Sequence, residues 1–590
     1  YNTSNDDNDD PTLYIDDDYV YYNTSNDDPY SYGDDDDENT DYDDYDKYNL
    51  TDEYDYDDDE PVDDDIFDEW KESNLEKILT VGDITQMLVE EQIITSINEY
   101  TGNPTGVLKN AVDYLANVHF SFKWVLDDDT LRKQFIEKFA LAALYYSTGG
   151  FRYGSDTASY KEMEPADRPW IKQNNWMEYP HVCNAVQKGL AVPDNTIDGI
   201  KEITTAENEA LIWEGIECDD EGFVIKINLK QNTLRGTLPE VLNGKTLPRL
   251  RHLDLADNHL NQGIPEDIGT FTNLVVLDLS GNEFRSTIPN LYHNSSLEYL
   301  SLGSNFLNGT ISTQFGQMST LKTLILNLNE LRGNIPPELE YASNLEYLDL
   351  SHNYLEGGIP DSLSRLNNSL VNLNLARNTL TGSLPSFIGE LTYLNSLDLD
   401  SLALDSDCMI PSEYGKLTNL YTLVLSSNQL VGSIPSTFSN LTLLEMLSLR
   451  NNKLTGAIPS TLAGSLTNLE MLYLNENELN NTIPSQIGQL SELNQLALQI
   501  NRLTGTIPTE MGLMKNIERC RLDFNALTGI VPKELSALSK LQHLTLYGNE
   551  KLQNDIPPEI CDLQETGNLS KIEINCYDTV PCDCCVCAFP

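Results

Sequence analysis

The sequence has few basic residues. It contains 36 lysine and arginine residues against 94 aspartate and glutamate residues, so its formal net charge is −58. A surface this acidic repels the phosphates of nucleic acids and the headgroups of anionic membranes, so neither is an expected partner. Cations and basic proteins are the partners that this charge favours.

Long apolar runs are also missing. None reaches the roughly 18 residues that a membrane-spanning helix needs, and the final residues, CDCCVCAFP, do not form the hydrophobic tail of a lipid-anchor signal. We therefore predict no insertion into a membrane. The chain starts at Tyr1 without a methionine or a signal peptide, so we expect that an upstream piece, such as a secretion signal, was removed or never included.

The known catalytic strings are absent as well. No HExxH, GxSxG or P-loop string occurs, and the seven histidines follow no metal-ligand spacing. Carboxylate pairs are abundant, but in so acidic a chain they do not indicate a catalytic site unless a cleft shifts the pKa of one member. We predict that the chain is not an enzyme and has no cofactor and no metal site.

Six of the ten cysteines lie within the last thirty residues. Such a density is typical of a chain end closed by disulfides. Zinc coordination by the crowded thiolates is the alternative, and the signs of secretion described next favour disulfides. The predicted disulfide cysteines at this end are Cys561, Cys576, Cys582, Cys584, Cys585 and Cys587.

Nine Asn-x-Ser/Thr sequences are acceptors for N-linked glycans in a secreted protein, although chance alone gives several. Together with the cysteines they predict a secreted, extracellular or cell-surface glycoprotein. The predicted acceptors are Asn2, Asn23, Asn49, Asn294, Asn308, Asn367, Asn440, Asn480 and Asn568.

The main body of the chain is a repeat with the pattern LxxLxLxxNxLxGxIP, as in LEYLDLSHNYLEGGIP from Leu345. Fourteen copies follow one another at intervals of 23 to 26 residues, a highly specific signal. They begin at Val224, Leu250, Leu274, Leu297, Leu321, Leu345, Leu370, Leu394, Leu420, Leu444, Leu469, Leu493, Ile517 and Leu541.

Each repeat needs its neighbours to bury its apolar side. The LxL piece predicts a short strand whose leucines point to one side, and stacking of the repeats covers them. The asparagine that follows, such as Asn258 or Asn353, is expected to bond backbone groups of the turn. Glycine permits the next turn and proline excludes a long helix there. The predicted fold is an α/β solenoid, a spiral with a parallel β-sheet on its concave side.

These repeats resemble the plant-type extracellular leucine-rich-repeat proteins, which include receptor-kinase ectodomains and polygalacturonase inhibitors. FALAALYYSTGG at residues 139–150 and IWEGIEC, which ends at Cys218, look like the N-terminal cap of that family. ALAALYYSTGG together with the terminal CysCys cluster is most similar to leucine-rich-repeat proteins of diatoms and related algae. The resemblance implies recognition of a protein or cell-wall carbohydrate at the cell surface, and a cap disulfide between Cys183 and Cys218.

Five segments are predicted. They are an acidic tail (1–65), a helical region (66–148), a cap with an insertion (149–223), the fourteen repeats (224–557) and a cysteine-rich C-terminal cap (558–590). In the helical region, Ile84, Met87 and Leu88 have helical spacing, as do Leu131, Phe135 and Phe139. We expect these helices to cover the open end of the spiral.

Two positions depart from the repeat pattern. In LNSLDLDSLALDSDCMIP, Leu402 stands where asparagine belongs and two residues are added around Cys408, so we expect a local break there. Cys520 occupies a core leucine position and is expected to be a small buried apolar residue.

The binding face is predicted from strand geometry. Residues that alternate with the buried leucines, and those just after the strand, are expected to face the concave side. Aromatic residues and arginine favour binding hot spots, although solvent-facing strand positions also carry tyrosine for its β propensity alone. The candidate ligand-binding residues are Tyr299, Phe306, Tyr347, His352, Tyr354, Met446, Met471, Tyr473, Arg502, Arg519 and Arg521.

The tail, residues 1–65, has 28 acidic residues against one lysine and contains YNTSNDD twice, at 1–7 and 22–28. Such a segment does not fold alone. It is a solvated spacer, a weak and irregular Ca²⁺ binder, or a segment that pairs with a protein. The leading functional hypothesis is a recognition module. The alternative is a structural subunit of an extracellular filament or wall matrix, a homo-oligomer in which the tail pairs with Arg502, Arg519 and Arg521 of another copy.

Overall fold

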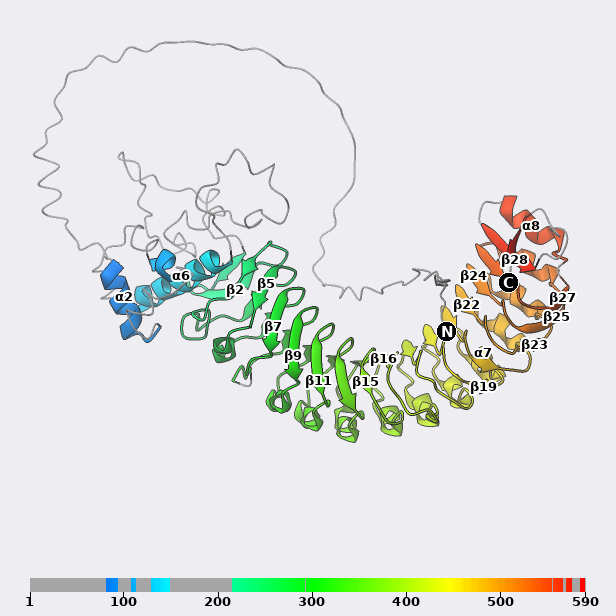
Figure 1. Cartoon of the computed structure of the whole chain (residues 1–590), viewed down its shortest axis with the longest axis horizontal. Coiled ribbons are helices and arrows are strands. Elements are labelled where there is room, and N and C mark those ends of the chain that lie inside the picture. Colours follow the sequence, from blue (N-terminus) through cyan, green and yellow to red (C-terminus); the bar gives the residue numbers. More distant parts are fainter. Residues whose placement is uncertain are drawn as a thin grey trace, which may run out of the picture. The chain divides into compact units, whose positions relative to one another are not determined.

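The structure is a computed structural model, and it describes residues 81–93, 108–112, 129–148, 215–291, 293–553, 555–565, 569–575 and 584–588. The predicted tail, residues 1–65, therefore lies outside the described residues. The repeats stack in an arc, with the strands on its inner side and short helical turns on its outer side (Figure 1). The predicted solenoid with a parallel sheet is confirmed.

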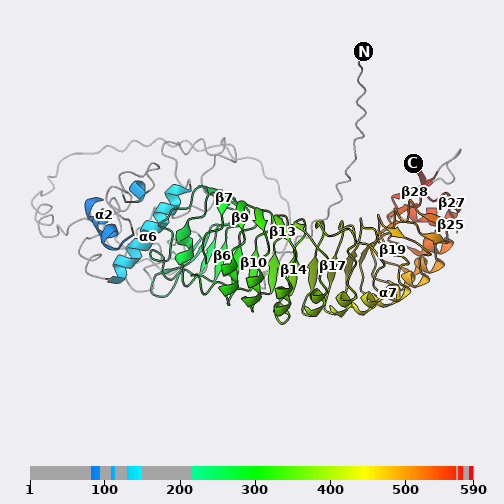
Figure 2. The same cartoon turned by 60° about the horizontal axis from the view of Figure 1, so that its bottom comes forward.

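The main sheet lines the concave side. Its first strand, β1, pairs antiparallel with β2, and from β2 onward each strand pairs in parallel with the corresponding strand of the next repeat. Figure 2 shows β6, β10, β14 and β17 following one another along this sheet. Its strands are β1 (Ile216–Cys218), β2 (Val224–Asn228), β4 (His252–Asp254), β6 (Val276–Asp278), β8 (Tyr299–Ser301), β10 (Thr323–Ile325), β12 (Tyr347–Asp349), β14 (Asn372–Asn374), β16 (Ser396–Asp398), β17 (Thr422–Val424), β18 (Met446–Ser448), β20 (Met471–Tyr473), β22 (Gln495–Ala497), β24 (Arg519–Arg521), β26 (His543–Thr545), β28 (Lys571–Asn575) and β29 (Cys585–Ala588).

A second, shorter set of parallel strands follows the main sheet along one flank. It is continuous from β3 to β15 and then reappears in two pieces, β19–β21 and β23–β25–β27. Its strands are β3 (Arg235–Gly236), β5 (His259–Gln262), β7 (Glu283–Thr287), β9 (Phe306–Thr310), β11 (Glu330–Gly333), β13 (Tyr354–Gly357), β15 (Thr379–Leu380), β19 (Thr455–Gly456), β21 (Glu478–Leu479), β23 (Thr504–Gly505), β25 (Ala526–Ile530) and β27 (Lys551–Gln553).

Short helical turns close the outer side, as the Ile-Pro element predicts. Proline precedes most of them and stands at their N-cap with extended dihedrals. They are η5 (Glu266–Thr270), η6 (Thr313–Gln317), η7 (Pro337–Tyr341), η8 (Asp361–Leu366), η9 (Ser386–Glu390), η10 (Ser412–Lys416), η11 (Ser436–Asn440), α7 (Ser460–Ser465), η12 (Ser485–Gln489), η13 (Thr509–Leu513), η14 (Lys533–Ala537) and α8 (Pro558–Glu565).

The repeat asparagines are structural, as predicted. Asn353 is buried, and its side-chain oxygen accepts a hydrogen bond from the Leu331 amide at 3.0 Å. Its Nδ2 donates to the carbonyls of Leu326 at 2.9 Å and Leu350 at 3.1 Å. The side chain thus joins its own repeat to the preceding one. Asn525 repeats the same three bonds with Leu503, Leu498 and Leu522.

The predicted break at Leu402 is confirmed. The leucine side chain has no amide group, so the three backbone bonds that the asparagine makes in other repeats are missing here, while the backbone N–H of Leu402 donates to Asn428 Oδ1 at 2.7 Å. The second set of strands is interrupted after β15, and before it resumes at β19 only an isolated bridge joins Met409 and Val431. Cys520 is buried in the core as expected.

The N-terminal end of the core is covered by a helix. α6 (Asp129–Ser147) places Ala140, Leu141 and Leu144 in the same apolar cluster as the first repeat (Figure 1). Its Glu137 Oε2 accepts a hydrogen bond from the Val224 amide at 3.1 Å. α2 (Val81–Glu90) and residues 108–112 pack with the other side of α6 through Ile84, Met87 and Leu88.

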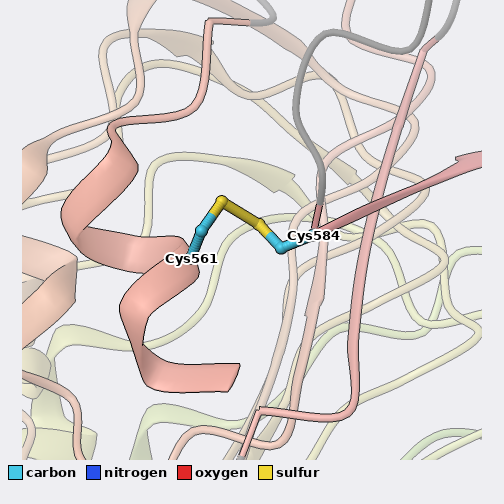
Figure 3. The surroundings of a disulfide bond; sticks show 2 residues. All are labelled: Cys561 and Cys584. Atoms are coloured by element: carbon cyan, nitrogen blue, oxygen red, sulfur yellow. A yellow bond between two sulfur atoms is a disulfide. The ribbon is translucent and has the colours of Figure 1, made fainter. Parts of the chain in front are cut away.

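The C-terminal end is closed by a disulfide. Cys561, on α8, is bonded to Cys584, directly before β29, and the two Cα atoms are 5.5 Å apart (Figure 3). Cys218, Cys585 and Cys587 are also disulfide-bonded, so none of these five residues is a zinc ligand. Cys183, Cys576 and Cys582 lie outside the described residues.

Candidate functional site

The candidate site is the concave face of the main sheet. In each three-residue strand the middle residue points into the core, and the first and third residues point out. Because the strands are parallel and in register, these outward residues form two columns across the repeats. Tyr299, for example, is paired with Thr323, which is paired with Tyr347, in the first column. The second column runs beside it through the third residue of each strand.

Seven of the predicted binding residues, Met471 among them, lie in these columns. Tyr299, Tyr347, Met446 and Arg519 belong to the first, and Tyr473 and Arg521 to the second. Met446 is next to Met471, and Met471 shares β20 with Tyr473. Met471 is only 7% exposed because its neighbours cover it, so it offers less surface than expected.

The structure places the other four predicted residues elsewhere. His352 follows β12 with a left-handed φ of 53°, and such a residue turns the chain away from the main sheet in most repeats. Phe306 and Tyr354 consequently begin β9 and β13 on the flank. Arg502 also follows this turn and pairs with Glu478 at 3.0 Å. The expectation that residues just after the strand face the concave side is therefore corrected for these positions.

Both flank aromatics are covered by arginine. The Arg285 guanidinium lies 4.5 Å from the centre of the Phe306 ring, and Arg332 lies 4.9 Å from the centre of the Tyr354 ring. Cation–π contact occupies one face of each ring. These rings therefore offer a sugar less open surface than the sequence indicated.

The C-terminal end of the concave face carries three cationic side chains and a histidine, which we call the basic cluster: Arg519, Arg521, Lys571 and His543. Arg519 is paired with His543, and His543 with Lys571, in the first column. Burial, together with the positive charges of Arg519, Arg521 and Lys571, lowers the pKa of His543. Lys571 forms an ion pair with Glu573, whereas Arg519 forms no ion pair with any described residue.

His543 and Lys571 were missed by the sequence analysis. His543 follows from the repeat register, which places it directly beside Arg519. Lys571 lies in the C-terminal cap, where β28 extends the main sheet although the leucine pattern has ended. An exposed ring, Phe524, lies in the left-handed turn after β24 and packs edge-on against Tyr547, with the ring centres 5.1 Å apart.

The central strands of the concave face have no formal charge in either column. We call this the uncharged segment. It consists of the outward residues of β17, β18, β20 and β22, which are Thr422, Val424, Met446, Ser448, Met471, Tyr473, Gln495 and Ala497. The Tyr473 hydroxyl donates a hydrogen bond to the side-chain oxygen of Gln495 at 2.7 Å.

The strands before them form an acidic segment. Its second column holds Asp254, Asp278, Asp349 and Asp398. Burial, helped by the nearby carboxylates of Asp400 and Asp349, raises the pKa of Asp398 to about 6, against the effects of the hydrogen bond from the Asp400 amide and of Arg377. Burial also raises the pKa of Asp349. Negative charge is therefore densest at the opposite end of the face from the basic cluster.

The predicted glycan acceptors differ in exposure. Asn308, Asn440 and Asn480 are exposed, and Asn367 is half-buried. Asn294 is fully buried, with its amide placed to donate to the carbonyls of Gly269 and Leu291, so a glycan there requires local unfolding. Asn2, Asn23, Asn49 and Asn568 lie outside the described residues.

The described residues were also compared with the requirements of a metal site and of a membrane-spanning helix. Within the described residues, no three histidine, cysteine, aspartate or glutamate side chains are grouped so as to hold a metal ion. No helix in the part of the chain that the structure describes is both long and apolar enough to cross a membrane.

Comparison with known protein families identifies the repeats. The model described as leucine rich repeat matches residues 295–355 and 418–479. The model for two leucine rich repeat copies matches 248–293, and a single leucine rich repeat matches 369–391.

Relatives of known sequence are plant receptors. Phytosulfokine receptor 1 of Arabidopsis thaliana is 30% identical over 188 residues, which are 27% of this chain and 18% of the receptor. Receptor-like protein 39 of the same plant is 31% identical over 235 residues, 39% of this chain and 24% of the relative. The chain thus spans less than a quarter of either relative.

Similar solved structures include an ectodomain of a plant receptor kinase. The ectodomain of the Arabidopsis thaliana membrane receptor kinase GASSHO1/SCHENGEN3, in complex with CASPARIAN STRIP INTEGRITY FACTOR 2, has 33% identity and a TM-score of 0.54, with 63% of this chain and 50% of that chain covered. The PEPR1–AtPEP1 structure has 31% identity and a TM-score of 0.51, with coverages of 63% and 59%. The resemblance to diatom and algal proteins stays a prediction.

Proposed function

We propose that this chain, a leucine-rich-repeat protein similar to plant receptor ectodomains and receptor-like proteins, is an extracellular or cell-surface recognition protein that binds an acidic peptide segment on its concave face. The basic cluster carries this proposal. In a chain with a net charge of −58, three cationic side chains beside a histidine on three successive strands require a reason. Binding of an anionic partner supplies one.

The chemistry of the cluster fits carboxylates. The planar guanidinium groups of Arg519 and Arg521 can each hold a carboxylate with two parallel hydrogen bonds. Arginine is also among the residues typical of binding hot spots. Two similar proteins were solved with a partner, which supports protein recognition as the general role.

Charge reversal tests the proposal. The probe is a fluorescein-labelled peptide of alternating aspartate and tyrosine, and its binding to the full chain is followed by anisotropy at 0.05 and 0.15 M NaCl. We expect the Arg519→Glu/Arg521→Glu variant to lose at least ten-fold in affinity, and salt to weaken binding because it screens the charges. The matched control is Arg285→Glu/Arg332→Glu on the flank, which should leave affinity within two-fold. Equal affinity of both variants would contradict the proposal.

Exposure of Asn308, Asn440 and Asn480 supports the extracellular location. Glycosidase treatment of the protein from its native source should lower its apparent mass. An unchanged mass would count against secretion.

A second candidate is self-association, in which the acidic tail of one copy supplies the anionic segment for the basic cluster of another. It is favoured by the charge of residues 1–65. Light scattering at physiological salt should then report a larger particle for the full chain than for a version without residues 1–65. If both are monomeric, the tail is a solvated spacer.

A further inference from the structure

The uncharged segment borders the basic cluster directly. Met471 and Tyr473 on β20 are paired with Gln495 and Ala497 on β22, and these are paired with Arg519 and Arg521 on β24. No charged residue of either column separates the two regions. A single bound segment can therefore contact both.

Exposed apolar residues continue the uncharged segment to the edge of the face. Tyr421 directly precedes β17 and is 41% exposed. Tyr393 and Leu443, which stand three residues before β16 and β18, are 54% and 36% exposed. Three such residues before three successive strands form a larger apolar area than isolated surface residues do.

Tyr393 and Leu443 occupy a position that carries a side-chain bond in several other repeats. There, asparagine donates to a carbonyl of the preceding repeat: Asn344 bonds Ser319, Asn419 bonds Thr392 and Asn468 bonds Thr442, at 2.7 to 2.9 Å. Tyrosine and leucine cannot make this bond and leave their apolar atoms exposed instead. Asparagine is therefore a residue that this position accepts without strain.

The acidic segment borders the other side of the uncharged segment. Asp398 on β16 is paired with Val424 on β17. Carboxylates of a partner are repelled here and attracted at Arg519 and Arg521, so the charge order of the sheet fixes where an acidic stretch can lie.

We infer that the partner segment carries a run of apolar residues next to a run of acidic residues, with the apolar run over the uncharged segment and the acidic run on the basic cluster. This inference rests on the proposed function and adds the partner's composition and its register. Parallel strands lie about 4.8 Å apart, so β17 to β28 spans roughly 29 Å, which an extended segment crosses in about nine residues.

Two peptides of equal composition test the register. One has five apolar residues, Leu-Tyr-Met-Leu-Phe, followed by four aspartates. The other distributes the same nine residues so that apolar and acidic residues alternate. We expect the block peptide to bind the full chain at least ten-fold more tightly in anisotropy, because the alternating peptide must place aspartates over the uncharged segment.

Two variants test the apolar contact without endangering the fold. Tyr393→Asn and Leu443→Asn each introduce the residue that makes this side-chain bond in several other repeats; for position 443 the equivalent carbonyl belongs to Thr418. We expect an unchanged or raised urea midpoint together with at least a five-fold loss of affinity for the block peptide. Leu513→Asn, on η13 at the outer side, is the matched control. It should leave the affinity for the block peptide unchanged.

The outcomes separate this inference from the proposed function. Equal binding of the two peptides, still lost on Arg521→Glu, would overturn the register and leave the proposed function standing. Unchanged binding by Tyr393→Asn and Leu443→Asn would overturn the apolar contact. Failure of both peptides to bind would overturn the inference together with the proposed function.

Discussion

The two ends of the concave face share one backbone and carry opposite charges. Asn353, beside the acidic segment, and Asn525, beside the basic cluster, make the same three side-chain bonds to the backbone. Yet the outward aspartates of the face lie on β4, β6, β12 and β16, whereas Arg519, Arg521 and Lys571 lie on β24 and β28. The comparison teaches that the buried ladder determines the scaffold, whereas the two outward columns can vary independently and determine what is bound.

The largest effect should come from breaking the shared scaffold. Asn353→Ala leaves the Leu331 amide and the carbonyls of Leu326 and Leu350 without their partner, which we expect to cost about 3 kcal/mol. Asn525→Ala should cost a similar amount. Since repeat arrays need not unfold as one unit, hydrogen exchange of the adjacent strands is the suitable measurement. A clearly smaller effect in one half would show that the ladder is not equivalent in both.

Much of this scaffold is predictable from sequence, and the site only in part. The leucine and asparagine positions predict the main sheet, and Leu402 predicts the interruption, because both depend on local, repeated chemistry. Phe306 and Tyr354 were placed on the wrong surface because the left-handed turn after the strand is not visible in the pattern. Lys571 was missed because β28 continues the sheet beyond the last recognisable repeat.

The next prediction compares how the two ends of the core are covered, by a disulfide at the C-terminal end and by α6 at the N-terminal end. Cys561→Ser/Cys584→Ser removes a cross-link between residues 23 apart in sequence, for which chain entropy predicts a loss of about 3 kcal/mol. The loss should be local. Hydrogen exchange should accelerate in β28 and β26 and stay unchanged around α6, where the core is covered without this bond. Equal acceleration at both ends would contradict this difference.

A smaller effect belongs to the acidic segment. Since the pKa of Asp398 is raised to about 6 in the folded chain from an ordinary 3.8, the folded state binds the proton more tightly than the unfolded state. The contribution of Asp398 to the free energy of unfolding is fully present below about pH 3.8 and is lost as the pH rises through about 6. Asp398→Asn keeps an acceptor for the Asp400 amide, so we expect it to stabilise the protein by about 1 to 3 kcal/mol at pH 7.5.

This gain should vanish at pH 4, where the native carboxyl is protonated. Thermal unfolding at the two pH values measures it. Asp361→Asn, at an exposed site on η8, serves as control. A gain of equal size at pH 4 would show that the charge of Asp398 is not its cause.

The smallest effect is expected on the flank. Arg285→Ala removes an exposed cation–π contact with Phe306, worth about 0.5 kcal/mol, and lies outside both columns. Urea unfolding should change by no more than this, and affinity for the block peptide should stay within two-fold. A strong loss of peptide affinity would move the binding surface from the concave face to the flank.

The most direct test of the account is hydrogen–deuterium exchange of the full chain with and without the block peptide. The account predicts added protection in the strands from β17 to β28, and little change in β4 to β14 and along the flank strands β3 to β15. Protection centred on the flank strands, or spread evenly over the acidic segment and the basic cluster, would contradict it.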